Sequence, residues 1–268
     1  MLNIYAWRAH SHLWRLINKI LLTLITVRNF VSAGLDYLQL SSGPYLILKL
    51  YSGLKIKVRS NTVDAHEVVT ILSGQEYPFK IIAPALNPQA VIIDIGAHIG
   101  SFTLYLKNKL PSSRVYCFEP AQSNYNILVD NINLNGLQNV KAIKMALAGK
   151  SGSAYLKTAG LNSNAYNLGN AGEAVASIDL DTFLRGENLE NIDLLKMDCE
   201  GTEYEILSNF KQLNKIKSII LEYHRLDDQF NGQYIINLLT AQGFVLNFRQ
   251  DLFDYERGIL YFIRDSIE

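Results

Sequence analysis

The sequence of 268 residues is poor in cysteine and has no excess of charge of either sign. Its two cysteines, Cys117 and Cys199, stand in apolar runs, so they indicate neither a disulfide framework nor a zinc ligand set. The 25 basic and 25 acidic residues cancel, and 49% of the residues are hydrophobic, which excludes intrinsic disorder. A reducing compartment fits this cysteine usage, and we expect a cytoplasmic protein.

Long hydrophobic runs are also missing. The most apolar stretch near the start, residues 20–27, lies between Lys19 and Arg28 and is far shorter than the ~20 residues that span a bilayer. No small-residue cleavage site follows it, so no secretory signal is predicted either.

Pattern changes divide the chain into an N-terminal appendage, residues 1–89, and a larger domain, residues 90–268. In the appendage, apolar residues at helical spacing predict a helix over residues 3–31. Alternating residues at 45–50 and 54–59 predict a β-hairpin, and a short helix is expected between Asp64 and Gly74.

The appendage is basic, because its first 60 residues hold eight Lys/Arg and only one acid, Asp36, a net charge of +7. Trp7 and Trp14 accompany a Leu/Ile stripe on the predicted helix. Such a helix suits peripheral contact with the anionic inner membrane surface. The commoner alternative is that the stripe packs against the catalytic domain or a second subunit. No nucleic-acid-binding motif is present, and we expect no nucleic acid partner.

From residue 90 onward strand-like and helix-like segments alternate, which predicts an α/β, Rossmann-like domain with a mostly parallel sheet. Strands are expected at 91–95, 115–118, 140–147, 194–197 and 216–221, and helices at 100–110, 122–134, 203–210 and 229–242. The segments 244–248 and 259–263 predict an antiparallel pair at the edge of the sheet.

The strongest local signal is the turn from Asp94 to Gly100, between a buried strand and a helix. Gly96 and Gly100 allow a tight turn, and the helix start offers free N–H groups to a ligand. Glu119 follows the last glycine by 19 residues, close to the ~20 expected of a carboxylate that binds a ribose. An adenosine-containing cofactor is therefore predicted.

Asp94 favours one such cofactor. A carboxylate before the turn would repel a pyrophosphate but attract the ammonium and sulfonium groups of S-adenosylmethionine. The glycine spacing also departs from Gly-x-Gly-x-x-Gly, which argues against a nicotinamide dehydrogenase. His98 lies within the turn and is expected near the cofactor, and Met145 and Ala146 are expected near adenine by position.

Candidate catalytic residues follow two later strands. Asp198 and Glu200 end one strand, and Glu222 and His224 end the next, so all four are expected at the carboxyl edge of the sheet. His224, with an ordinary pKa near ~6.5, is the natural candidate to take a proton from a hydroxyl, with Asp198 as the other candidate. Glu203 more simply stabilises the start of a helix. Asp198 and Glu222 would alternatively suit Mg²⁺, although no metal is favoured.

The chain resembles the FkbM-type S-adenosylmethionine-dependent methyltransferases between about Arg59 and Tyr223. The resemblance is carried by VIIDIGAHIG (91–100), FEP (118–120), SIDLDTF (177–183) and LKMDCEGTEY (195–204). It implies a class I methyltransferase fold, a seven-stranded sheet with a reversed final hairpin. It also implies methyl transfer to oxygen, often on a sugar, glycolipid or polyketide hydroxyl. The matching cofactor positions are Asp94, Gly96, Gly100 and Glu119, whereas Asp198 and Glu200 match the reacting end. His98 departs from the family, which more often has Asn there.

Two questions stay open at this point. The polar segment 158–173 is either a lid or saccharide-binding loop near the site or an insertion without that role. A binding or scaffold protein that keeps an inactive methyltransferase fold is the main alternative to an active enzyme.

Overall fold

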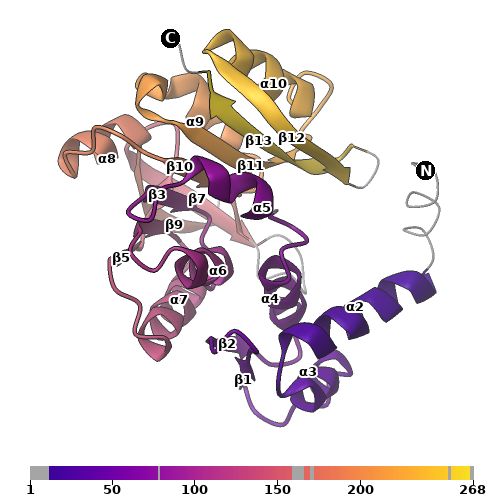
Figure 1. The fold of residues 1–268 in the computed structure, drawn as a ribbon. Helices are drawn as coiled ribbons and strands as arrows, with labels where there is room; N and C mark the ends of the chain where they lie inside the picture. The colour runs from indigo at the N-terminus through magenta and orange to yellow at the C-terminus, as the bar shows by residue number, and fades with distance from the viewer. Residues whose placement is uncertain (1–11, 78, 159–165, 170–171, 253–254, 266–268) are drawn as a thin grey trace. The chain divides into compact units, whose positions relative to one another are not determined.

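The computed structural model describes residues 12–77, 79–158, 166–169, 172–252 and 255–265 (Figure 1). Trp7 and the predicted first turns of the N-terminal helix therefore lie outside the described residues. The chain forms two compact units, residues 1–76 and 77–268. Residues 77–89, which we expected in the appendage, thus group with the larger unit.

The first unit contains three helices and a hairpin among its described residues. The helices are α2 (His12–Thr26), α3 (Phe30–Tyr37) and α4 (Asp64–Leu72), and the antiparallel hairpin joins β1 (Tyr45–Lys49) to β2 (Lys55–Arg59). The single helix predicted over 3–31 is wrong at its C-terminal end. There, Val27 forms a β-bridge with Leu50 and the Arg28 N–H donates to the Lys49 carbonyl at 2.7 Å. The backbone groups that would continue the helix are bonded to the hairpin instead.

The second unit is built on a seven-stranded sheet with the order β12-β13-β11-β10-β3-β4-β5. Its strands are β3 (Val91–Ile95), β4 (Arg114–Phe118), β5 (Val140–Ile143), β10 (Leu194–Met197), β11 (Ser218–His224), β12 (Phe244–Leu252) and β13 (Arg257–Arg264). The central pairs are parallel, whereas β13 is antiparallel to both β11 and β12. This order and the reversed final hairpin confirm the predicted class I methyltransferase fold.

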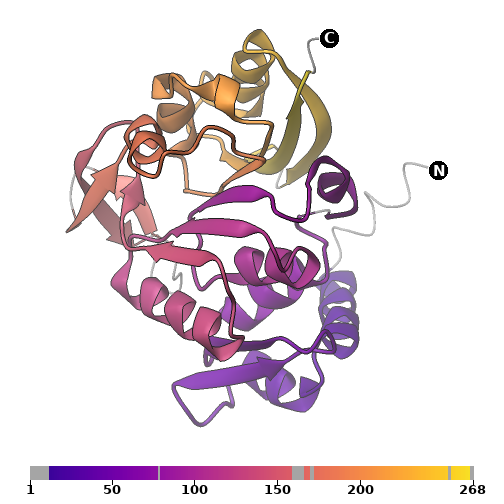
Figure 2. The same cartoon turned by 60° about the vertical axis from the view of Figure 1, so that its left-hand side comes forward.

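Helices cover both faces of this sheet (Figures 1 and 2). The helices α8 (Leu180–Gly186), α9 (Glu203–Asn209) and α10 (Gly232–Ala241) pack on one face, in a core shared with Ile93, Leu195 and Ile219. On the other face, Thr103 of α6 (Ser101–Lys109) contacts Asp94 and Cys117. The helix α7 (Gln122–Leu134) adjoins the start of α6, because the Asn131 amide donates to the Ile99 carbonyl. Burial of each large apolar side chain contributes about 1.5–3 kcal/mol to such a core.

A second, four-stranded sheet was not predicted. It has the order β6-β9-β7-β8, with β6 (Ala146–Leu147), β7 (Gly152–Thr158), β8 (Tyr166–Gly169) and β9 (Glu173–Ile178). The predicted strand 140–147 is therefore two strands in different sheets. The segment 158–173 contains β8 and the start of β9, while residues 159–165 and 170–171 lie outside the described residues. Its role as a lid or saccharide loop stays a prediction.

Candidate active site

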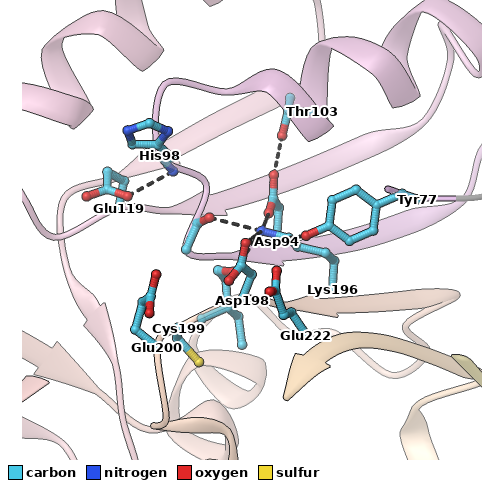
Figure 3. A network of polar contacts seen from close by, with 12 residues as sticks. Tyr77, Asp94, His98, Thr103, Glu119, Lys196, Asp198, Cys199, Glu200 and Glu222 are labelled. Carbon is cyan, nitrogen blue, oxygen red and sulfur yellow. Dashed lines mark hydrogen bonds and ion pairs between the residues drawn. The ribbon is translucent and has the colours of Figure 1, made fainter. Parts of the chain in front are cut away.

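The candidate site lies where β3, β4, β10 and β11 end. Because these four strands are parallel, their carboxyl ends meet at one edge of the sheet, where ligands of open α/β sheets bind. The residues predicted from strand ends are brought together there. Figure 3 shows Asp94, His98, Glu119, Asp198, Glu200 and Glu222 around this edge.

The turn after β3 is shaped by two glycines with positive φ. Gly96 has φ +72°, and a Cβ built there would lie 1.8 Å from the Asp198 carbonyl oxygen, so only glycine lets the two strand-end loops approach. Gly100 has φ +92° and precedes α6. His98 between them also adopts a left-handed conformation, with φ +50°, which histidine adopts more readily than a branched residue.

Glu119 ties this turn to the end of β4. One of its oxygens accepts the His98 N–H at 2.9 Å, and the other accepts from the Ala121 N–H at 3.0 Å and the Asn124 amide at 3.3 Å. Three donors leave part of the acceptor capacity of the carboxylate for ribose hydroxyls. Burial raises the pKa of Glu119 to about 7, although these hydrogen bonds oppose the rise.

Asp94 is paired with a lysine at the end of β3. Its side chain is fully buried, its Oδ1 lies 3.1 Å from the Lys196 Nζ, and its Oδ2 accepts from the Thr103 hydroxyl at 2.7 Å. Lys196 stands beside Asp94 in the register of β10 and β3, and its ammonium also donates to the Gly96 carbonyl at 2.9 Å. Asp94 thus holds the lysine that contacts the glycine turn, and its expected attraction of the cofactor ammonium stays a prediction.

Asp198 carries a carboxylate that is more accessible than that of Asp94. Its side chain is 28% exposed, and its Oδ2 lies 3.9 Å from the Lys196 Nζ. Tyr77, fully buried, donates its hydroxyl to the same oxygen at 3.3 Å and packs edge-on against Phe102. The carboxylate is therefore held in place by a cation and a hydroxyl from two different segments.

The loop after Asp198 is organised by Glu203. Its buried carboxylate accepts the backbone N–H groups of Cys199 and Gly201, both at 2.8 Å. This agrees with a role at the start of α9 rather than in the reaction. Glu200 has a positive φ of +56°, and its Oε2 lies 3.4 Å from the His224 Nε2. Burial raises the pKa of Glu200, and His224 opposes that rise.

His224 is surrounded by carboxylates. Its Nδ1 lies 3.6 Å from Glu203, and its Nε2 lies 3.9 Å from Glu222 as well as near Glu200. Burial lowers the pKa of His224, but the surrounding Glu203, Asp198 and Glu200 outweigh it and raise the pKa to about 9. These carboxylates thus favour the protonated imidazole, and the expected role of His224 as a base stays a prediction.

Glu222 takes the place next to Asp198 that proton transfer requires. Its side chain is 7% exposed, and the Arg257 guanidinium lies 3.3 Å from its Oε1. Burial, assisted by the charge of Asp198, raises the pKa of Glu222 to about 7, while His224 and Arg257 oppose the rise. Glu222 thus has a pKa near neutral pH and lies beside the Asp198 carboxylate.

Met145 and Ala146 follow the end of β5, next to the strand that carries Glu119. Met145 is partly buried against the core and Ala146 is buried. The Glu119 N–H donates to the Ile143 carbonyl at the end of β5, so this segment adjoins the ribose-binding candidate. The geometry is consistent with the predicted adenine position, which stays a prediction.

Three residues of the site had no role in the sequence-based prediction. Lys196 stood in a quoted motif, but its partner Asp94 lies about a hundred residues earlier. Tyr77 and Arg257 come from segments outside the strand ends, and no local pattern marks them. These residues belong to the site because of the side chains that they contact in the folded structure.

A metal ion has one candidate position here. Asp198, Glu222 and His224 each offer a ligand atom, and these atoms lie within 4.8 Å of one another. The same carboxylates already have Lys196 and Arg257 as cationic neighbours. The three residues thus offer ligand atoms of the right type for a metal ion. The lysine and the arginine, however, already place positive charge beside the carboxylates.

The sheet order and the acidic edge beside a glycine turn define the methyltransferase class of doubly wound proteins. A family model described as "Methyltransferase FkbM domain" matches residues 94–246, from the end of β3 into β12. The chain belongs to this family of S-adenosylmethionine-dependent methyltransferases.

Curated relatives agree with this assignment. "Methyltransferase sdnD" of Sordaria araneosa is 29% identical over 49% of this chain and 65% of its own length. "AMB antimetabolite synthetase AmbE" of Pseudomonas aeruginosa is 31% identical over 62% of this chain but only 10% of its own length. "31-O-demethyl-FK506 methyltransferase FkbM" of Streptomyces tacrolimicus is 24% identical over 62% of this chain and 76% of its own. The chain thus spans less than two thirds of the first two relatives.

Proposed function

We propose that this protein is an active methyltransferase that transfers a methyl group from S-adenosylmethionine to a hydroxyl oxygen. The acceptor class we favour is a saccharide, glycolipid or polyketide-like molecule. Family membership supports the methyl transfer, and the relative from Streptomyces tacrolimicus is named for an O-demethyl substrate. The observation that carries the proposal is the Asp198–Glu222 carboxylate pair beside the glycine turn of β3.

The balance of charges at the site fits this cofactor. Six acidic side chains around this edge outnumber the three basic ones: Asp94, Glu119, Asp198, Glu200, Glu203 and Glu222 against Lys196, His224 and Arg257. An edge with an excess of carboxylates attracts a ligand with net positive charge. In our proposal the Glu119 carboxylate accepts hydrogen bonds from the ribose hydroxyls, and the Gly96–Gly100 turn lets the ligand approach the backbone.

When bound, S-adenosylmethionine supplies a methyl carbon on a positively charged sulfur, which leaves as S-adenosylhomocysteine. The chain contributes chiefly by positioning the acceptor oxygen in line with that carbon and sulfur. As the oxygen–carbon bond forms, the hydroxyl proton passes to the Asp198–Glu222 pair and from there to water. Asp198 is the member that the acceptor reaches, because its side chain is the more exposed of the two.

His224 acts in this proposal as a positioning residue. Its imidazolium lies between Glu200 and Glu203, and it faces Glu222, so it fixes the negative charges around it. The Arg257 guanidinium likewise fixes the negative charge of Glu222. Neither group offers a free base at neutral pH, which leaves proton acceptance to the carboxylates.

Two measurements test the proposal. Calorimetry with S-adenosylmethionine, S-adenosylhomocysteine and NAD tests the donor; we expect both sulfur compounds to bind and NAD not to. Binding of NAD alone would support the nicotinamide enzyme that the family match argues against. Incubation with methyl-labelled donor and hydroxylated acceptors then tests turnover. Donor binding with no labelling of free saccharides, glycolipids, polyketides or a source-cell extract would favour an inactive binding protein.

A further inference from the structure

In the helix α2 of the first unit, the exposed side chains among residues 17–26 are all large and apolar. Ile17, Ile20, Leu21, Leu24 and Ile25 expose between 40% and 69% of their surface. Their spacing places them on one side of the helix, while Leu22 and Thr23 on the other side are buried. A helix on the surface of a water-soluble protein shows the reverse pattern, with polar residues outward.

The next helix repeats this inversion. Phe30, Val31, Leu35 and Leu38 of α3 and its C-cap are exposed, and Leu40 follows them with 64% exposure. The buried positions of α3 are Ala33 and Asp36. Exposed apolar residues in such number mark a surface that meets something other than water.

The hairpin that adjoins these helices adds basic groups. Across its two strands Ile47 stands opposite Lys57, and Lys49 stands opposite Lys55. On β1 the exposed residues Tyr45, Ile47 and Lys49 follow one another at every second position. A lysine therefore shares this face of the strand with an aromatic and an aliphatic side chain.

Negative charge is missing from the surface of this segment. Between residues 12 and 63 the one acidic residue is Asp36, and it is 1% exposed. Arg28, Lys49 and Lys55 are exposed in the same stretch. A second copy of the chain joined through a two-fold axis would bring the same basic residues of both chains together, because a two-fold contact is self-complementary. An anionic surface meets both the apolar and the basic side chains.

We propose that the first unit binds the surface of an anionic lipid bilayer. The outward side chains of α2 and α3 enter the boundary between headgroups and acyl chains, and the lysines of the hairpin and Arg28 contact lipid phosphates. The binding is peripheral, since none of the described helices combines the length and hydrophobicity needed to cross a bilayer.

Vesicle co-sedimentation of the full chain tests this proposal. We expect the protein to pellet with vesicles of phosphatidylcholine containing about a third phosphatidylserine, to pellet little with pure phosphatidylcholine, and to be released by salt. Lys49→Glu/Lys55→Glu should weaken partitioning at least tenfold, since each basic residue near such a surface contributes appreciably. Leu21→Ser/Ile25→Ser should weaken it on both vesicle types.

Matched controls separate membrane binding from general effects of charge or folding. Lys150→Glu/Lys211→Glu makes the same charge change on exposed lysines of the second unit and should pellet like the unaltered protein. Val245→Ser removes an equally exposed apolar residue there. Failure of the full chain to pellet with anionic vesicles, or equal loss in variants and controls, overturns the proposal. A dimer in solution that Leu21→Ser/Ile25→Ser dissociates, without vesicle binding, would assign the face to a second copy.

Discussion

At the scale of single residues, the candidate site depends on which carboxylates hold a proton. His224 lies among three glutamates, and their charges turn a residue that often serves as a base into a fixed cation. In our proposal, proton acceptance then falls to Asp198 and Glu222. The role of each group is set by its neighbours rather than by its type.

Asp198→Asn should lower kcat by about 10² to 10⁴ while leaving the dissociation constant of the donor nearly unchanged. The amide keeps the shape of the side chain but cannot take up a proton, and positioned acid–base groups contribute roughly this factor. Steady-state kinetics with a methyl acceptor, together with calorimetry of donor binding, would measure both quantities. Full turnover in this variant would exclude Asp198 from proton transfer.

The pH dependence of turnover should report Glu222. Its pKa is raised to about 7, so the carboxyl group is protonated below that pH and able to share a proton only above it. We therefore expect kcat to rise as pH increases through about 7, and Glu222→Gln to remove this rise. A pH–rate profile from 5.5 to 8.5 for both proteins makes the comparison. An unchanged rise in Glu222→Gln would assign it to another group.

At the scale of elements, β3 and β10 are joined by more than backbone hydrogen bonds. Asp94 and Lys196 face each other on these neighbouring strands, buried among apolar side chains. Lys196 also donates to the carbonyls of Ile95 and Gly96, so the ion pair holds the end of β3 at the start of the glycine turn. Removal of Asp94 takes from the buried Lys196 the nearer of its two carboxylates, and removal of Lys196 leaves the Asp94 carboxylate buried without that cation.

Asp94→Ala should therefore act first on stability, lowering the free energy of unfolding by about 3–5 kcal/mol. This differs from the sequence-based expectation that the variant chiefly weakens donor binding. Asp94→Leu/Lys196→Met replaces both charges with apolar groups and should recover much of the loss. Urea unfolding of the three proteins measures these free energies. Asp94→Ala with normal stability but weak donor binding would restore the original interpretation.

Among the elements, the helix α8 was not predicted from the sequence. Asp179 caps it, because its carboxylate accepts the Thr182 N–H at 2.7 Å and the Thr182 hydroxyl at 2.8 Å. An aspartate directly before a helix is a signal that the sequence contains. The strands of the second sheet carry a weaker signal, since Ala146–Leu147 is a two-residue strand whose partner β9 lies about thirty residues later.

At the scale of the whole molecule, the remaining chemical question is whether the isolated protein carries a metal ion. Asp198, Glu222 and His224 have suitable ligand atoms, but Lys196 and Arg257 already lie beside the carboxylates. We expect that dialysis against EDTA leaves both turnover and the melting temperature unchanged, and that added Mg²⁺ does not raise them. Metal analysis of the purified protein would accompany these assays. Loss of turnover in EDTA that Mg²⁺ restores would make Asp198 and Glu222 metal ligands.

The sequence by itself determined the alternation of strands and helices, the glycine turn and the residues that end each strand. These features are local, because hydrophobic period and turn chemistry depend on near neighbours. It also determined which strand ends meet, since parallel strands of one sheet share an edge.

Only the tertiary structure decided what the site residues do. Asp94 is a buried ion partner of Lys196, and Glu203 and its neighbours raise the pKa of His224 to about 9. Tyr77 and Arg257 enter the site from segments that no local pattern connects to it. The physical reason is that ionisation and burial depend on all charges within a few ångströms in space, whatever their distance along the chain.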